Sequence, residues 1–179
     1  MVLDESGRTL VDEIAEAALA RGYRGRYAGQ NRERNAWWGA AGEVVVAQGL
    51  GLELPLAGAA PGRYDLQAPR GGVQVRARTR PDFDLMIAPE DRYHARDPFV
   101  LVVPREALAP VLPDRLRFLI VGWILGSNAM IPRYWTGYRR HPLHGVVPHD
   151  AWAVPGVDLE DLVDLERLLG LPEPQLELF

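Results

Sequence analysis

Apolar positions in the first fifty residues recur at the spacing of helices. A first helix is predicted from Ser6 or Thr9, either of which can cap it, to Gly22, which would end it. Its apolar stripe would consist of Leu10, Ile14, Ala17 and Leu19. A second helix is predicted over about residues 33–48, with Gly49 and Gly51 as stop signals. The apolar face of this second helix would consist of Trp37, Ala40, Ala41, Val44 and Gln48. The chain should therefore open with two consecutive helices.

After the second helix the pattern changes to short segments with strand character, separated by Gly, Pro and Arg. These segments are residues 64–66, 73–77, 84–87, 99–103 and 118–124. The Gly71-Gly72 pair is predicted to form a hairpin turn, and the continuous apolar run 99–103 is typical of a strand buried on both faces. A last strand within residues 148–154 and a helix over about 159–169 complete the order. This order predicts an α/β domain with a mixed central sheet flanked by helices.

The 179 residues are about the size of one domain. Residues 1–170 are expected to form this domain and residues 171–179 an extended tail, because Pro172 and Pro174 cannot continue a helix. No apolar stretch is long enough to span a membrane, and the N-terminus lacks the basic start and apolar run of a secretory signal. The chain has no cysteine, which excludes a disulfide framework and a thiolate metal site. We therefore expect a cytoplasmic protein with no membrane partner.

The basic side chains are all arginine, and they are unevenly placed in a chain of net charge -4. Two segments are strongly basic. The first contains Arg21, Arg24, Arg26, Arg32 and Arg34, and the second contains Arg63, Arg70, Arg76, Arg78 and Arg80. Aromatic residues lie in or beside the first segment, and arginine interleaved with aromatic rings is typical of surfaces that track phosphates and stack bases. On charge alone, a DNA-binding surface and a solvated arginine-rich face are equally favoured.

Four polar residues stand in an order that could build a catalytic centre. Glu43 lies in the second predicted helix, and Asp65 begins the predicted hairpin. Gln74 and Arg76 lie two apart on the next strand and therefore share one face. Two carboxylates and an amide oxygen facing one point would suit Mg²⁺ or Mn²⁺, which prefer hard oxygen ligands. Such an ion can activate water and stabilise charge on a phosphate, which Arg76 could hold. Taken singly, each residue is better explained as an ordinary surface or turn residue, and only their order favours a site.

This order resembles that of the PD-(D/E)XK nuclease superfamily. The residues that carry the resemblance are Gly42-Glu43 in a helix, Tyr64-Asp65-Leu66, and Val73-Gln74-Val75-Arg76 on a strand. In that superfamily a helix Glu, a strand Asp and a Glu-x-Lys or Gln-x-Lys strand build a metal-dependent phosphodiesterase site. The resemblance covers about residues 30–125 and implies a restriction-endonuclease-like fold that hydrolyses DNA in replication or repair. The resemblance also allows a homodimer, since many members of the superfamily act as dimers.

The resemblance also implies a role for each site residue. The catalytic set would be Glu43, Asp65, Gln74 and Arg76. Of these, Glu43, Asp65 and Gln74 would bind Mg²⁺ or Mn²⁺, and Arg76 would hold the phosphate. Contacts to the DNA backbone are expected from Arg21, Arg24, Arg26, Arg32, Arg34, Arg78 and Arg80.

Two positions depart from the superfamily pattern. Gln74 supplies a neutral oxygen where many members have Glu, and Arg76 stands where lysine is usual. Arginine does not lose its proton in proteins, so Arg76 can stabilise charge but cannot act as a base. The alternative function is therefore a catalytically degenerate DNA-binding adaptor on the same fold. A protein-interaction module without a DNA role is a further alternative.

Three histidines near the C-terminus, His141, His144 and His149, have the imidazole ligands that zinc accepts. Pro142, Gly145 and Pro148 separate them, and neither a cysteine nor a regular helical histidine pair accompanies them. This pattern favours a loop over a metal site.

The last five residues, Gln175-Leu176-Glu177-Leu178-Phe179, resemble the bacterial sliding-clamp binding pentapeptide Gln-Leu-(Ser or Asp)-Leu-Phe. Gln175 would be the polar anchor, and Leu176, Leu178 and Phe179 would fill an apolar pocket. The alternative is that these apolar side chains fold back onto the domain. The resemblance implies the sliding clamp as a partner, which would raise the effective concentration of an acidic protein on DNA.

Overall fold

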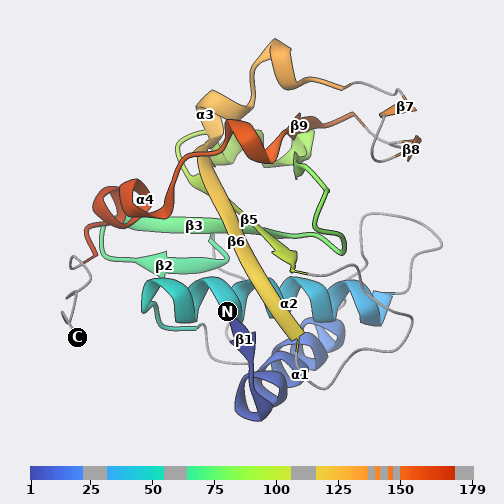
Figure 1. Cartoon of the computed structure of the whole chain (residues 1–179), viewed down its shortest axis with the longest axis vertical. Helices are drawn as coiled ribbons and strands as arrows, with labels where there is room; N and C mark the ends of the chain where they lie inside the picture. Colours follow the sequence, from blue (N-terminus) through green and yellow to red (C-terminus); the bar gives the residue numbers. More distant parts are fainter. Residues whose placement is uncertain are drawn as a thin grey trace.

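A curled mixed sheet with two helices along one side forms the centre of the computed structural model (Figure 1). The structure describes residues 1–21, 32–54, 64–105, 116–136, 140–141, 145–146 and 150–171, with only the backbone of the two short pieces between 137 and 149. The helices are α1 (Glu5–Ala20), α2 (Arg32–Leu50), α3 (Gly126–Ala129) and α4 (Leu162–Leu169). The strands are β1 (Val2–Leu3), β2 (Leu66–Ala68), β3 (Gly71–Ala77), β4 (Leu85–Ile87), β5 (Pro98–Pro104), β6 (Leu116–Leu125), β7 (Arg140–His141), β8 (Gly145–Val146) and β9 (Trp152–Val154). Three short 3-10 helices are η1 (Pro89–His94), η2 (Pro132–Tyr134) and η3 (Gly156–Asp158). The predicted α/β class is confirmed.

The main sheet has five strands in the order β1-β6-β5-β3-β2. β3 pairs with β5 in parallel, and the other neighbouring strands are antiparallel. Every residue of β5 is buried, because this strand lies in the middle of the sheet with both faces covered. The register between β5 and β6 shifts at Leu101 and Val102, and β6 runs diagonally across the sheet (Figure 1). The sheet is therefore mixed, as the sequence predicted, and strongly curled.

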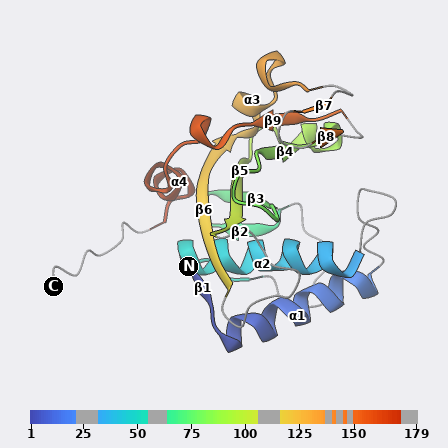
Figure 2. The same cartoon turned by 45° about the vertical axis from the view of Figure 1, so that its right-hand side comes forward.

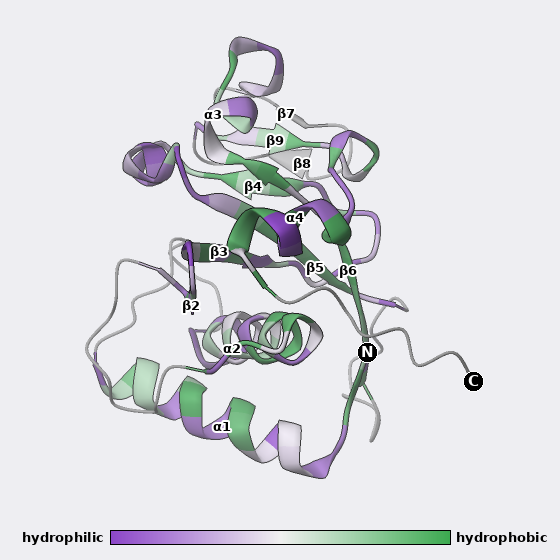
Figure 3. Cartoon of the chain, turned by 90° about the vertical axis from the view of Figure 1, so that its left-hand side faces the viewer, coloured by the Kyte–Doolittle hydropathy of each residue, from purple (hydrophilic) through white to green (hydrophobic). Residues whose placement is uncertain are grey.

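Helix α2 lies between α1 and the sheet, as Figure 2 and the end-on view in Figure 3 show. A helix that is covered on both sides buries residues all round instead of on one stripe. This position explains why the consecutive residues Val44 to Val46 are all fully buried. The predicted apolar face was wrong at its ends, because Gln48 is exposed and Trp38, not Trp37, lies in the core. Trp37 is partly buried, and its Nε1 donates to Asp12 Oδ1 on α1 at 2.8 Å.

The first helix begins slightly earlier than predicted. Asp4, and neither Ser6 nor Thr9, is its N-cap. Asp4 Oδ1 accepts a hydrogen bond from the Gly7 backbone N–H at 2.8 Å. A capping carboxylate satisfies a helix N–H that has no partner within the helix and also favours the positive end of the helix dipole.

The β2–β3 hairpin turns at Pro69-Arg70 and not at the predicted Gly71-Gly72. Ala68 already pairs with Gly71, so the two glycines are the first residues of β3. Gly72 is needed there for a different reason: a Cβ at this position would lie 1.9 Å from Cγ of Tyr64, whose ring covers the strand. The corrected turn places Asp65 directly before β2 and not within a strand.

The face of the sheet opposite α2 is covered by the two-stranded β4–β9 ribbon and α3 (Figures 2 and 3). The predicted last helix is present as α4, which ends at the left-handed Gly170 (φ 69°) before the predicted tail. The tail with Gln175, Leu176, Leu178 and Phe179 lies outside the described residues. In the part of the chain that the structure describes, no helix has the length and apolarity needed to cross a membrane.

Candidate functional site

Glu43 is set against the sheet by its neighbour Gly42. A Cβ at position 42 would lie 2.8 Å from Cβ of Ala77 and 3.2 Å from Cγ1 of Val75, both on β3. Contacts this short would push the helix and the strand apart. Gly42 therefore sets the distance between Glu43 and the strand that carries Arg76.

We predict that Gly42→Ala lowers the free energy of unfolding by about 1–3 kcal/mol, because the added methyl overpacks the helix–strand contact. Gly39→Ala is the matched control in the same helix, since a Cβ at position 39 meets no atom within 4 Å. The control should gain up to about 1 kcal/mol from better helix propensity. Urea unfolding of both variants measures the difference. Equal effects of the two substitutions would show that α2 and β3 do not meet at Gly42.

Asp65 closes the end of the β2–β3 ladder. Its carboxylate Oδ2 accepts the backbone N–H of Val75 at 2.7 Å. That N–H belongs to the part of β3 beyond the last pair with β2, so the carboxylate takes the place of a strand residue. The same oxygen accepts a hydrogen bond from Arg76 Nη1 at 3.2 Å. Asp65 thus holds both the backbone and the arginine of the candidate site.

Arg76 lies between two carboxylates. Its Nη1 donates to Asp65 and to the Val75 carbonyl oxygen, the latter at 2.8 Å, and its Nη2 lies 3.1 Å from Asp91 Oδ2 on η1. The guanidinium carbon sits 5.1 Å from the centre of the Phe99 ring, a cation–π contact. Its Nε is buried and has no hydrogen-bond partner within the described residues. Arg76 is therefore held in place by its two carboxylate partners and the Phe99 ring.

The surroundings of Glu43 disfavour the ionised form of its carboxyl group. Burial, followed by the negative charge of Asp65, raises its pKa from an ordinary 4.5 to about 8. The positive charges of Arg76 and Arg21 act in the opposite direction and lower this pKa. Glu43 therefore lies within electrostatic range of Asp65 and Arg76, whose side chains are hydrogen-bonded to each other.

Gln74 lies in a second, adjacent polar cluster. It is 3% exposed, and its Nε2 lies 3.2 Å from His94 Nδ1. His94 Nδ1 is also 2.6 Å from Asp97 Oδ2, and both of these side chains are buried. The imidazole Nδ1 carries at most one proton, and the shorter contact is the one with the carboxylate. The amide nitrogen of Gln74 thus faces the Asp97–His94 pair, and the role of its oxygen as a third metal ligand stays a prediction.

Three polar residues of these clusters, Asp91, His94 and Asp97, were not among the predicted site residues. Asp91 and His94 lie on η1, and residues three apart on a 3-10 helix lie above one another on the same side. This geometry sets Asp91 against Arg76 and His94 against Gln74. The signal was present as an acid-x-x-His-x-x-acid spacing, which becomes meaningful only once the segment is known to be a 3-10 helix.

The donor set suits a divalent cation in part. Glu43 and Asp65 offer carboxylate oxygens close enough to influence each other, which Mg²⁺ and Mn²⁺ prefer. Among the described residues, no three His, Cys, Asp or Glu side chains gather closely enough to hold a metal ion by themselves. Mg²⁺ is commonly bound by one or two carboxylates and completes its shell with waters and substrate phosphates. Two carboxylates therefore fit Mg²⁺ better than they would fit an ion that needs a full protein cage.

The predicted DNA-binding arginines lie in two places. Arg21 ends α1 close enough to Glu43 to affect its pKa, and Arg32 and Arg34 are exposed at the start of α2. Arg24 and Arg26 lie outside the described residues.

Arg78 and Arg80 follow Arg76 along the chain, and both guanidinium groups lie over the ring of Phe83. Of the three histidines near the C-terminus, His141 lies in β7, and His144 and His149 lie outside the described residues.

Comparison with known proteins found no matching family model, no similar curated protein and no similar solved structure.

Proposed function

We propose that this protein is a metal-dependent DNA nuclease of the restriction-endonuclease-like fold that acts in replication or repair. The observation that carries the proposal is the hydrogen-bonded pair of Asp65 and Arg76 at the β2–β3 hairpin, with Glu43 of α2 near enough for both charges to shift its pKa. Partial burial and a neighbouring carboxylate both disfavour the ionised form of Glu43, and groups with pKa values shifted in this way are concentrated at functional sites. The order of a helix, an antiparallel pair and a parallel step from β3 to β5 supports the proposed fold.

In this proposal Glu43 and Asp65 hold Mg²⁺ or Mn²⁺, which when bound activates a water molecule and stabilises charge on the phosphate. Arg76 contributes a fixed positive charge, because Asp65, Asp91 and the Phe99 ring keep its guanidinium in place. Arg76 stays protonated, so its role is electrostatic.

The second candidate function is a DNA-binding adaptor that does not cleave. The observation in its favour is that both terminal nitrogens of Arg76 already bond to carboxylates of this chain. An arginine occupied in this way can serve the fold alone. The adaptor would bind DNA in a salt-sensitive manner without metal-dependent turnover.

Cleavage assays on a panel of labelled DNA structures separate the two functions. The purified protein would be incubated with single strands, duplexes, flaps, junctions and mismatched duplexes in Mg²⁺, in Mn²⁺ and in chelator. The nuclease proposal expects products in at least one metal and none in chelator. Salt-sensitive binding without products under any condition would favour the adaptor. Neither binding nor cleavage would leave a protein-interaction module as the function.

We also propose that residues 175–179 bind the bacterial sliding clamp. The left-handed Gly170 ends α4 directly before the prolines at 172 and 174, which cannot continue a helix. Deletion of residues 175–179 is expected to abolish binding to a purified clamp in surface plasmon resonance, whereas DNA cleavage without the clamp should be unchanged. The control is the full chain with Glu177→Ala, which keeps the Gln, Leu and Phe anchors. Retained clamp affinity in the truncated protein would contradict the role of the tail.

A further inference from the structure

Beyond the end of β3, two arginines and a phenylalanine form a group that the proposed catalytic chemistry does not use. The guanidinium carbons of Arg78 and Arg80 lie 5.2 Å and 5.1 Å from the centre of the Phe83 ring. The backbone N–H of Arg78 donates to Val102 O at 2.8 Å, which continues the pairing of β3 with β5. The group, which we call the arginine–phenylalanine stack, is therefore anchored in the main sheet.

The guanidinium group of Arg80 forms two hydrogen bonds with the carboxylate of Asp82, which lies two residues further along the chain. Arg80 Nε donates to Asp82 Oδ1 at 3.0 Å, and Arg80 Nη2 donates to Asp82 Oδ2 at 2.8 Å. Two parallel hydrogen bonds of this kind are also how a guanidinium binds a phosphate. The side chains of Arg80 and Asp82 are 57% and 45% exposed, and ion pairs this exposed contribute little to stability. A phosphate can therefore replace the carboxylate without disturbing the fold.

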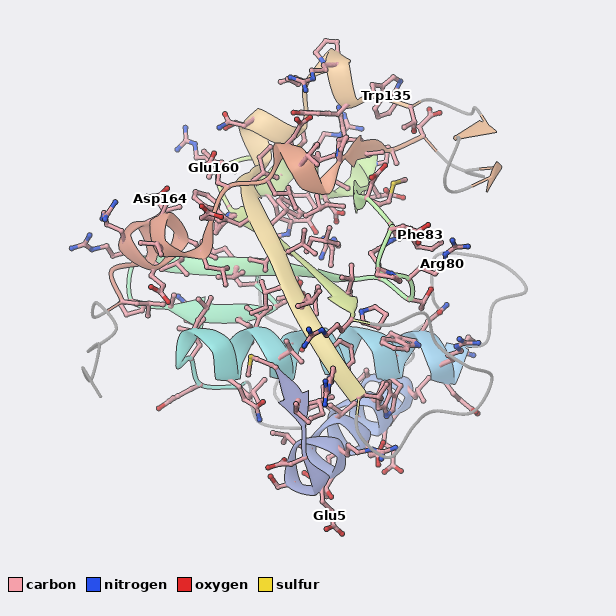
Figure 4. All side chains as sticks on the ribbon, in the orientation of Figure 1. Glu5, Arg80, Phe83, Trp135, Glu160 and Asp164 are labelled. Carbon is pink, nitrogen blue, oxygen red and sulfur yellow. The ribbon has the colours of Figure 1, made fainter. Side chains whose placement is uncertain are left out.

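The arginine–phenylalanine stack lies in line with the candidate site. Arg76 and Arg78 are two apart on one extended segment, so they share a face and their Cα atoms are about 7 Å apart. Arg80 and Phe83 continue from there toward the right-hand edge of the molecule in Figure 4. A nucleic acid strand that passes over Arg80 and Arg78 would thus arrive at Arg76.

We propose that the arginine–phenylalanine stack binds the phosphate backbone of the DNA strand that enters the site, and that Asp82 competes with this phosphate for Arg80. This inference rests on the proposed DNA substrate, and it adds which residues bind the DNA strand next to the candidate site. Stacking on Phe83 limits the freedom of both guanidinium groups before DNA arrives, which lowers the entropic cost of binding. Asp82 lowers the affinity of Arg80 for any anion, because the anion must first displace the Asp82 carboxylate.

The first test removes the competitor. Asp82→Asn keeps the shape of the side chain but removes its charge, and it should tighten DNA binding roughly 3- to 5-fold at low salt, about the factor that an exposed ion pair is worth. The probe is fluorescence anisotropy of an end-labelled DNA strand and of the same duplex, in chelator so that no cleavage occurs. The matched control is Asp164→Asn, which makes the same charge change at another exposed pair, Arg167–Asp164, with N and O 3.0 Å apart. Asp164 and Arg80 lie on opposite sides of the molecule in Figure 4.

The second test removes the arginine. Arg80→Gln should weaken binding and reduce the slope of log K against log salt by about 0.9 for the duplex or about 0.7 for the single strand, as expected for one lost phosphate contact. Arg167→Gln, the control at the other pair, should leave the slope unchanged. Tighter binding with Asp82→Asn but not with Asp164→Asn, together with the reduced slope in Arg80→Gln, would support the inference.

Two outcomes would overturn it, and they differ in what else they contradict. If the unmodified protein binds DNA but both Asp→Asn variants change the affinity equally, only net charge matters, and the competition by Asp82 is wrong while the proposed function stands. If neither the unmodified protein nor Asp82→Asn binds DNA, the proposed function fails together with the inference.

Discussion

Asp65→Asn is expected to reduce metal-dependent DNA cleavage by at least about 100-fold and to leave the protein folded. Even groups that only orient a metal ligand are worth about 10–100-fold, so a lost ligand charge should cost at least the upper value. Asparagine is the informative substitution because its amide oxygen can still accept the Val75 N–H, a bond that Asp65 makes at 2.7 Å. Asp65→Ala would leave that backbone N–H without this partner and would confuse loss of chemistry with loss of structure.

The measurement is the rate of product formation under single-turnover conditions in Mg²⁺ and in Mn²⁺, with circular dichroism to verify folding. Asp12→Asn on α1 is the matched control, since it makes the same substitution at a carboxylate that also accepts a hydrogen bond, from Trp37 Nε1. Its cleavage rate should equal that of the unmodified protein. An unchanged rate in Asp65→Asn would remove Asp65 from the catalytic centre, whatever the fate of the rest of the proposal.

Glu43→Gln is expected to stabilise the metal-free protein at pH 8 by up to about 4 kcal/mol relative to its effect at pH 4. The folded protein holds the Glu43 proton up to a pKa of about 8, whereas the unfolded chain releases it at an ordinary pKa of 4.5. Between these values the folded state binds one proton more than the unfolded state, so stability falls by about 1.4 kcal/mol per pH unit as the pH rises. Glutamine has no proton to lose and therefore escapes this fall.

Chemical denaturation at pH 4, 6 and 8 in chelator would measure the effect of Glu43→Gln. Glu16→Gln, an exposed position on α1, controls for the loss of one negative charge. Addition of Mn²⁺ at pH 8 should stabilise the unmodified protein more than Glu43→Gln, because the ion would compensate the buried carboxylate. If the free energy of unfolding depends on pH in the same way in the unmodified protein and in Glu43→Gln, the pKa of this carboxyl group is not raised by folding.

The amino-acid sequence alone predicted the two leading helices, the buried β5 and the order of the elements. These features follow from local signals, namely helical spacing of apolar residues, glycine stop signals and a continuous apolar run. The candidate residues Glu43, Asp65 and Arg76 were identified in the same way, from their order on a helix, a turn and a strand. The structure joins Asp65 to Arg76 by a hydrogen bond and places Glu43 within electrostatic range of both.

Errors arose where a tertiary contact overrides a local signal. The Gly71-Gly72 pair looks like a turn, but Gly72 is there because the Tyr64 ring lies over it, and the chain turns at Pro69-Arg70. The apolar face predicted for α2 assumed a helix with one solvent side, whereas α1 covers the second side. Neither fact is encoded in the spacing of nearby residues.

Tertiary packing also determines how the polar residues divide between the two clusters. Gln74 and Arg76 share one face of β3, which the alternation of strand side chains predicts. Which partner each of them meets depends on η1, a 3-10 helix that places Asp91 beside Arg76 and His94 beside Gln74. Sequence thus determined which residues are available for chemistry, because residue type and local spacing are local properties. Only the packing of η1 and α2 on the sheet decided which of them meet, because those contacts join segments that are distant along the chain.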